Sequence, residues 1–194
     1  NALFGNLPAQ AWLWEVALVG LYSGMRANEI CSLEWSDVRK SEGVWYFDIT
    51  ESKSEAGVRK VPVHSRLAWL LKRRPSKAEG QIWPDLKPGG KDGKHSHYYS
   101  KRFTAWRRSC GITDPRKVFH SLRKNAVQCL ERARVQQSDA AQIVGHEREG
   151  VTYDTYSPLG LTMKQRRDVV EKIKYPGFRA AKFQGKYQAH AVRA

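Results

Sequence analysis

Residues 44–63 read VWYFDITESKSEAGVRKVPV, and this stretch decides the fold class. In its first half Trp45, Phe47 and Ile49 alternate with other residues and fall on one face, the pattern of a strand with a buried side. After a turn around 54–57, residues 58–63 are expected to pair back as the second strand of a hairpin. Most of the rest shows helical patterns, so we predict a mainly α protein with one small antiparallel β-sheet (α+β).

The most apolar of the expected helices covers residues 9–21. It is apolar nearly all round, which predicts burial, and Pro8 can open it while Ser23-Gly24 ends it. The apolar run 11–22 contains Glu15 and is too short to cross a bilayer, so no membrane partner is expected.

Shorter helical patterns cover 27–33, 65–74, 96–109, 119–133, 138–144 and 161–174. Ser65 is expected to cap the second of these. Residues 75–94 are rich in Pro, Gly and Lys and are expected to form a loop.

The charge is large, positive and unevenly distributed. The 194 residues contain 34 Lys and Arg against 19 Asp and Glu, a net charge of +15. Residues 51–74 have seven basic and two acidic side chains (+5), 101–135 have ten and two (+8), and 176–194 have four and none (+4). Solvated surfaces usually mix both signs, so this clustering indicates a polyanionic partner. No basic amphipathic helix with a bulky apolar face stands out, which favours nucleic acid over a membrane surface.

The three cysteines are odd in number and widely spaced: Cys31, Cys110 and Cys129. Without a C-x-x-C pair they indicate neither a disulfide framework nor a zinc knuckle, and a reducing, intracellular setting fits best. His95 and His97 could be half of a zinc site, but no second pair of ligands is suitably spaced. The chain begins at Asn1 without a Met or a signal peptide, which suggests a piece of a longer protein.

Three short motifs carry unusual side-chain chemistry. G-M-R-A-N-E-I places Arg26 at the entrance of an expected helix, with Glu29 one turn later. H-S-L-R at 120–123 puts an imidazole and a guanidinium on one helical face. A glycine followed by His146 ends another expected helix, and Tyr156 stands ten residues further on. Each motif alone has an ordinary explanation, such as an ion pair between Arg26 and Glu29, but their order and spacing together are hard to attribute to chance.

Taken in this order, the motifs resemble those of the tyrosine recombinase, or phage integrase, family. The resemblance covers about residues 8–175, the catalytic domain of that family. Supporting motifs are LEWSDV at 33–38, RKVPV at 59–63 and YPG at 175–177. The resemblance assigns the catalytic positions to Arg26, Lys53, His120, Arg123, His146 and Tyr156.

The roles that the resemblance implies agree with the chemistry of phosphodiester transfer. Arg26 and Arg123 can each give a forked pair of donors to the nonbridging oxygens, where negative charge accumulates. Tyr156 would attack the phosphate and conserve the phosphoester as a 3′-phosphotyrosine, so that the strand is rejoined without a cofactor or metal. Lys53, on the hairpin turn, would protonate the leaving 5′-oxygen.

The two histidines have supporting roles in the same scheme. His120 would position the phosphate or help to move the tyrosine's proton, and His146 would donate a hydrogen bond to a nonbridging oxygen. Two assignments have alternatives. Tyr153 could be the nucleophile, although the spacing favours Tyr156, and Lys60 could take the place of Lys53.

Other functions compete with this interpretation. Asp48, Glu51 and Lys53 form a loose D-x-x-E-x-K pattern that could hold Mg²⁺ in a metal-dependent nuclease. A non-catalytic DNA-binding module would explain the basic residues at 101–135 but not the ordered motifs. A topoisomerase of the type IB kind would share the chemistry without exchanging strands.

We therefore predict a catalytic domain at 1–175 and a basic C-terminal tail at 176–194. The resemblance implies that double-stranded DNA is the partner, that a homotetramer assembles on two paired recombination sites, and that accessory DNA-bending or directionality proteins take part. It also implies that the tail packs against a neighbouring protomer, with a disordered tail as the alternative. The expected location is the cytoplasm of a bacterium or of a phage-infected host cell, on the nucleoid. The family's N-terminal DNA-binding half is not among these 194 residues.

Overall fold

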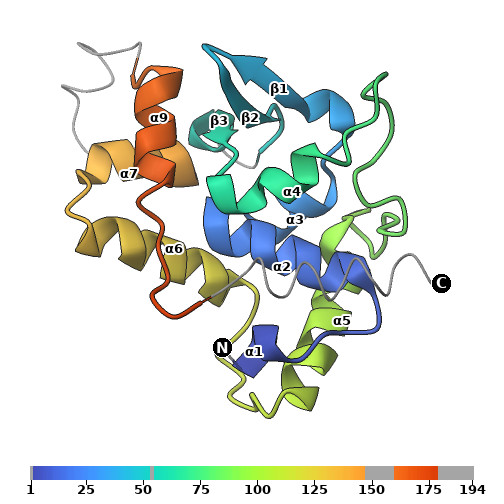
Figure 1. Ribbon diagram of the computed structural model, residues 1–194. Helices are drawn as coiled ribbons and strands as arrows, with labels where there is room; N and C mark the ends of the chain where they lie inside the picture. Colours follow the sequence, from blue (N-terminus) through green and yellow to red (C-terminus); the bar gives the residue numbers. More distant parts are fainter. Residues whose placement is uncertain (1, 53–54, 147–159, 179–194) are drawn as a thin grey trace.

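The computed structural model describes residues 2–52, 55–146 and 160–178 (Figure 1). Its three-stranded antiparallel sheet has the order β1 (Val38–Ser41), β2 (Val44–Ile49) and β3 (Arg59–Pro62). The predicted hairpin is confirmed as β2 and β3, with Phe47 opposite Val61. The predicted class, mainly α with a small antiparallel sheet, is confirmed as well.

Strand β1 is an addition that the sequence analysis did not predict. It joins β2 through a two-residue turn in which Glu42 and Gly43 both have positive φ angles, 51° and 79°. Such turns suit tight hairpins because their twist matches that of the strands. The β1 segment, VRKS, is short and mostly polar, so it lacks the alternation that marks β2.

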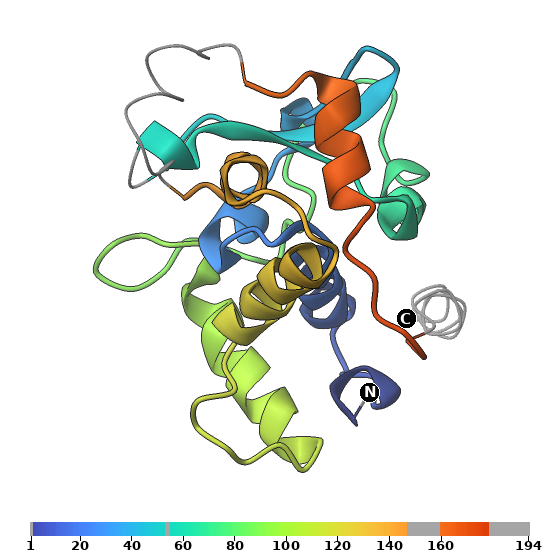
Figure 2. The same cartoon turned by 90° about the vertical axis from the view of Figure 1, so that its left-hand side faces the viewer.

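The sheet buries side chains on both faces. Phe47 and Ile49 join the main core, as the alternation predicted, and Trp45 packs against that core while partly exposed. The opposite face forms a second cluster with α9 (Met163–Val170), made of Val44, Tyr46 and Met163. Figure 2 shows α9 lying across the sheet on this side.

The helical body is built around α2 (Ala11–Ser23), which is buried along almost its whole length. The helix α6 (His120–Arg132) packs along it, and α5 (Ser96–Ser109) contacts it from another side (Figure 1). Two short helices, α1 (Ala2–Gly5) and α4 (Ala68–Leu71), and the short α3 (Ala27–Cys31) complete this layer.

The helix α7 (Gln137–Val144) lies between the sheet and α6. It contacts β3 on one side and α6 on the other, and Figure 2 shows this layering. The consequence for function is that the end of α7 comes close to the starts of α3 and α6, although these elements are far apart in the sequence. No helix among the described residues is long and apolar enough to span a membrane.

Two helix predictions are corrected. The segment expected as one helix at 65–74 is a 3₁₀ turn (Ser65–Leu67) followed by α4, and its cap is His64, whose side chain accepts a hydrogen bond from the Arg66 amide (3.0 Å). Ser65 donates its hydroxyl to Glu171 instead (2.8 Å). The helix expected at 161–174 spans only Met163–Val170: it begins at Met163 because Thr162 caps it, and Glu171 is its C-cap. The other predicted helices lie within two residues of α2, α3, α5, α6 and α7.

Candidate active site

Arg26 stands where α3 begins. Gly24 ends α2 in the left-handed conformation (φ 67°), which turns the chain so that Arg26 caps α3. The Arg26 amide donates to Glu29 Oε2 (2.8 Å) and its Nη1 to Glu29 Oε1 (2.7 Å), so the ion pair that the sequence allowed is present. Its Nη2 also donates to the carbonyl of Gly145 (3.0 Å), 119 residues away. The side chain is still 37% exposed, so the guanidinium has an open side for a ligand.

Arg59 is a residue of this site that the sequence analysis named only within the RKVPV motif. It faces inward from β3 and its side chain is 3% exposed. Nη1 and Nη2 donate to the two carboxylate oxygens of Glu29 (3.1 and 2.9 Å), and Nε donates to the carbonyl of Ile143 in α7 (2.7 Å). The sequence contained a signal for this role. Arg59 stands two residues before Val61, so in a strand both side chains point to the same buried face, and a buried arginine must find partners there.

Glu29 is ionised in this environment. Burial raises the pKa of its carboxyl, but the hydrogen bonds and charge of Arg59 and the hydrogen bonds from Arg26 outweigh burial, and the net pKa lies below its usual range. Glu29 therefore holds two guanidinium groups close together, one open to solvent and one buried.

Arg123 places a third guanidinium in the same region. It lies one turn into α6, is 3% exposed, and donates from Nη1 to the carbonyl of Gly24 (2.7 Å). Its Nη2 is buried and has no hydrogen-bond partner among the described residues. Burial, and then the charges of Arg26 and Arg59, lower the pKa of Arg123 to about 10, so it is charged at neutral pH. A buried charged donor without a partner is costly, which is the expected condition of a group that binds an anion.

His120 and His146 border this cluster from two different helices. His120 is the first residue of α6, and His146 follows Gly145, the C-cap residue of α7. Burial lowers the pKa of both imidazoles, and the charge of Arg123 is the next largest cause for each. Arg26 lowers both pKa values further. Both rings are therefore mainly neutral at pH 7, and each has one nitrogen that donates and one that accepts.

The glycine before His146 is required by geometry. Gly145 has a φ of 72°, which favours glycine, and ends α7. A Cβ atom there would lie 2.8 Å from Arg59 Nη1 and 3.0 Å from the carbonyl oxygen of Ala56. The Gly-His motif thus brings the end of α7 against Arg59 and against the β2–β3 connection. The carbonyl of Gly145 also accepts the hydrogen bond from Arg26.

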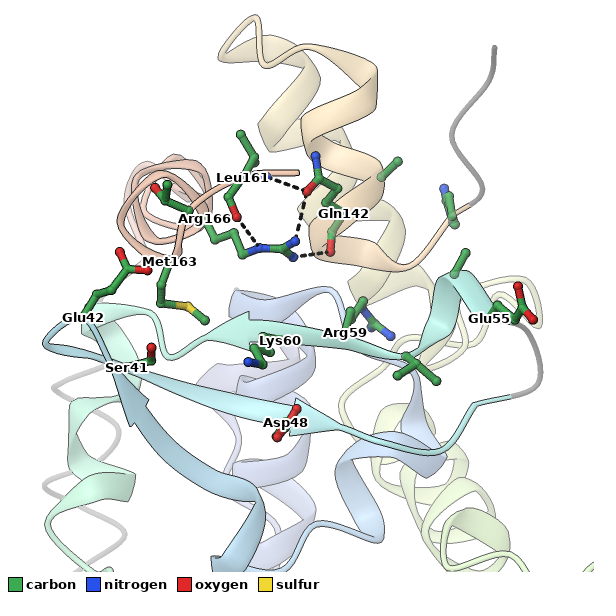
Figure 3. Close-up of a pocket in the computed structure, with 15 residues that line it drawn as sticks. Ser41, Glu42, Asp48, Glu55, Arg59, Lys60, Gln142, Leu161, Met163 and Arg166 are labelled. Atoms are coloured by element: carbon green, nitrogen blue, oxygen red, sulfur yellow. Dashed lines mark hydrogen bonds between the residues drawn. The ribbon is translucent and has the colours of Figure 1, made fainter. Parts of the chain in front are cut away.

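A cavity of about 1070 Å³ opens beside His146, between the sheet and the helices α7 and α9 (Figure 3). Lys60, the alternative to Lys53, lines this cavity, and its Nζ lies 5.4 Å from the centre of the Tyr46 ring. Asp48, which the nuclease alternative needs, also lines it and pairs with Arg39 (3.0 Å). Within the described ranges, no group of three His, Cys, Asp or Glu side chains is placed to hold a metal ion.

The structure thus brings together four of the six predicted site residues: Arg26, His120, Arg123 and His146. Lys53 and Tyr156, with the alternative Tyr153, lie outside the described residues. Of the histidines that suggested half of a zinc site, His95 contacts the Leu86 carbonyl through Nδ1 (2.7 Å).

The charges of this site favour an anion with several oxygens. Three guanidinium groups face one carboxylate, and the two imidazoles are neutral at pH 7. Guanidinium groups donate in a planar fork that matches phosphate and carboxylate geometry. The arrangement can bind a phosphate and stabilise additional charge on its oxygens.

Comparisons with known proteins show a family match in sequence and a distant likeness to solved structures. The sequence matches the family model described as "Phage integrase family" over residues 5–159. No curated protein matches it. Among solved structures, the Tn1549 transposon integrase in complex with transposon right end DNA matches at 16% identity and a TM-score of 0.46, covering 88% of this chain and 62% of that one. The same integrase in complex with circular intermediate DNA matches at 16% identity and a TM-score of 0.45, covering 89% and 64%. The present chain therefore spans less than two thirds of those integrase chains.

Proposed function

Because the chain belongs to the phage integrase family, we propose that it is the catalytic domain of a site-specific recombinase that cleaves and rejoins DNA through a covalent 3′-phosphotyrosyl intermediate. The observation that carries this proposal is the guanidinium cluster, in which Arg123 Nη2 is buried next to Arg26 and has no hydrogen-bond partner within residues 2–52, 55–146 and 160–178. A scissile phosphate placed there would satisfy that donor.

The arginines supply the electrostatic part of the mechanism. Attack on a phosphodiester adds negative charge to the nonbridging oxygens, and Arg26 and Arg123 would donate to these oxygens more strongly as the charge develops. Four hydrogen bonds hold the Arg59 guanidinium on Glu29 and on the carbonyls of Gly57 and Ile143, so its proposed role is to hold the site together rather than to contact the phosphate.

Tyr156 is the proposed nucleophile. Its phenolic oxygen forms a bond to phosphorus while the bond to the 5′-oxygen breaks, so one phosphoester replaces another and no external energy source is needed. His120, neutral at pH 7, would accept the phenolic proton or position the phosphate. His146 would donate a hydrogen bond to a nonbridging oxygen.

Lys53 is the proposed general acid. An expelled 5′-alkoxide is strongly basic, so a proton donor there should accelerate cleavage by about 10² to 10⁴. The described neighbours of Lys53 support the assignment: Ala56 and Gly57 follow it on the β2–β3 connection, and their carbonyls lie close to Gly145 and Arg59.

The proposed partners follow from the family and from the charge. The substrate would be double-stranded DNA, exchanged within a homotetramer on two paired sites, with accessory DNA-bending or directionality proteins. Residues 1–175 would form the catalytic domain and 176–194 a tail that packs against a neighbouring protomer. The described start of this tail is attached to the body, since Phe178 lies 5.2 Å from Phe4 between ring centres.

Replacement of Tyr156 tests the proposal. Tyr156→Phe removes only the hydroxyl, so covalent attachment to a nicked DNA substrate should be lost while DNA affinity is nearly unchanged. The matched control, Tyr153→Phe, should still form the adduct, and peptide mapping should find DNA on Tyr156. An adduct on Tyr153 would overturn the assignment. DNA binding by the wild-type chain without any adduct would favour a binding module, and cleavage that requires Mg²⁺ would favour a nuclease.

A sulfur-substituted substrate tests the role of Lys53. When the bridging 5′-oxygen is replaced by sulfur, the leaving thiolate needs no proton. Lys53→Ala should therefore be severely slow on ordinary DNA and close to wild type on the sulfur substrate, whereas Arg123→Ala should be slow on both. If sulfur fails to rescue Lys53→Ala, then Lys53 is not the general acid.

A further inference from the structure

A ring of hydrogen bonds joins α7 to the start of α9 (Figure 3). The side-chain oxygen of Gln142 accepts from the Leu161 amide (2.9 Å) and from Arg166 Nη2 (3.0 Å). Arg166 closes the ring, because its Nε donates to the Leu161 carbonyl (3.1 Å) and its Nη1 to the Gln142 carbonyl (3.3 Å). The side chains of Gln142 and Arg166 thus hold both the backbone N–H and the backbone carbonyl of Leu161.

The backbone before Leu161 fits this ring closely. Gly160 has a φ of 59°, and a Cβ atom there would collide with the side-chain oxygen of Gln142. On the other side of the ring, α9 is fixed by its own cap and by the core: Thr162 and Gln165 exchange hydrogen bonds, and Val170 is fully buried. The ring therefore holds the point where the chain enters α9.

This point is close to Tyr156 in the sequence. Tyr156 precedes Gly160 by four residues, and a four-residue span reaches at most about 14 Å. From His146 to Tyr156 there are ten residues, a span that allows up to about 36 Å. Gly160 and Leu161 are therefore the described anchor that lies nearest to Tyr156 along the sequence. The same helix, α7, carries Gln142 and ends at the Gly-His motif, so the anchor and the phosphate site share one rigid element.

We propose that Gln142 and Arg166 are positioning residues that set the reach of Tyr156 to the phosphate site. The proposal rests on the function proposed above. A nucleophile held near its target reacts faster because the entropy of orienting it is lost before the reaction rather than during it. A misplacement of about 1 Å can lower the rate by about 10²-fold. Neither side chain is required to touch the DNA.

The test compares two substitutions of one residue. Gln142→Ala removes the acceptor for Leu161 and Arg166, and should slow covalent attachment at saturating DNA by about 10- to 100-fold, with DNA affinity and melting temperature close to wild type. Gln142→Glu keeps an oxygen acceptor for both donors and should restore the rate. Gln137→Ala is the matched control, an exposed glutamine on the same helix, and should have no effect.

Each outcome decides the proposal. A wild-type rate for Gln142→Ala, or equal slowing by Gln142→Glu, would overturn it, and a loss of affinity alone would indicate a DNA contact instead. If Gln142→Ala does not fold, Gly160→Ala tests the same contact from the tyrosine side and should slow attachment in the same way. Tyr156→Phe is measured in parallel: if it still forms the adduct, the proposed nucleophile fails, whereas an inactive Tyr156→Phe beside a fully active Gln142→Ala would defeat only the positioning role.

Discussion

At the scale of single residues, Glu29 and Arg123 have different roles in the site. Glu29 accepts from Arg26 and Arg59, and so neutralises part of the charge that these guanidiniums bring together. Arg123 contacts a backbone carbonyl instead, and its second terminal nitrogen has no partner among the described residues. The surplus positive charge is therefore concentrated where Arg123 meets Arg26, which is the place we assign to the phosphate.

The two site histidines make stability depend on pH. The pKa of His120 and that of His146 are lowered from 6.5 by burial and then by Arg123. The unfolded chain, with ordinary pKa values, binds more protons below about pH 6.5, so the free energy of unfolding should fall between about pH 7.5 and about pH 5.5. Urea unfolding at both pH values measures this.

Substitution distinguishes the contribution of the two site histidines to the pH dependence of stability from that of other groups. His120→Gln and His146→Gln should each reduce the pH dependence, because a neutral side chain binds no proton in either state. His64, whose pKa is also lowered by burial, contributes a background that both variants share. A pH dependence unchanged in the double variant would contradict the assignment.

At the scale of elements, the distance between α2 and α6 depends on a glycine. Gly20 lies inside α2, and a Cβ atom there would lie 2.5 Å from the tip of the Phe119 ring. That ring cannot move away easily, since it is buried in edge contacts with Tyr99 and Phe103, whose ring centres lie 5.4 and 5.6 Å away. Phe119 directly precedes His120, so the contact also sets where α6 begins.

Gly20→Ala should lower the stability of the protein, although alanine has a higher helix propensity than glycine. Inside a helix, Gly→Ala usually stabilises by about 0.5–1 kcal/mol, but Gly20→Ala should destabilise by about 1–3 kcal/mol because the packed ring must shift. Thermal unfolding measures the sign. Cleavage should slow as well, since α6 carries both His120 and Arg123.

Two variants serve as references for this effect. Gly5→Ala adds the same methyl group at a helical glycine with nothing within 4 Å, and should be neutral or stabilising. Adding Phe119→Leu to Gly20→Ala should recover part of the loss by making room. A stabilised Gly20→Ala would show that the ring yields and that α6 is not held by this contact.

At the scale of the whole molecule, the charge of +15 should make DNA binding strongly salt-dependent. Lys124 is exposed on α6, and its charge lowers the pKa of His120, so it lies beside the site. Lys124→Ala should weaken binding equally for all DNA sequences and make the slope of log K against log salt shallower by about 0.9, the value for one phosphate contact. Titrations at several salt concentrations measure the slope.

The matched control for Lys124 is Lys77→Ala. It removes the same charge from an exposed position after α4, outside the basic segment 101–135, and should leave the slope nearly unchanged. Little salt dependence in the wild-type chain would count against nucleic acid as the partner.

The sequence alone determined the features that depend on neighbours in the chain. The alternation of Phe47 and Ile49 specified the β2–β3 hairpin, and the apolar stretch at 9–21 specified the buried α2. The order of the motifs was enough to name the family and the residues from Arg26 to His146 that the fold then brings together. These signals are readable because strand and helix periodicity and motif spacing extend over only a few residues.

Only the tertiary structure decided which distant groups satisfy one another. Arg59 belongs to the site because it reaches Glu29, 30 residues away, and the end of α7, 84 residues away. Glu15, the one carboxylate in α2, is held by Trp83 (2.7 Å), and the Gln142 ring joins segments on either side of the proposed nucleophile. The physical reason is that a buried charge or amide must find a partner after the chain has packed, and that partner is chosen by proximity in space.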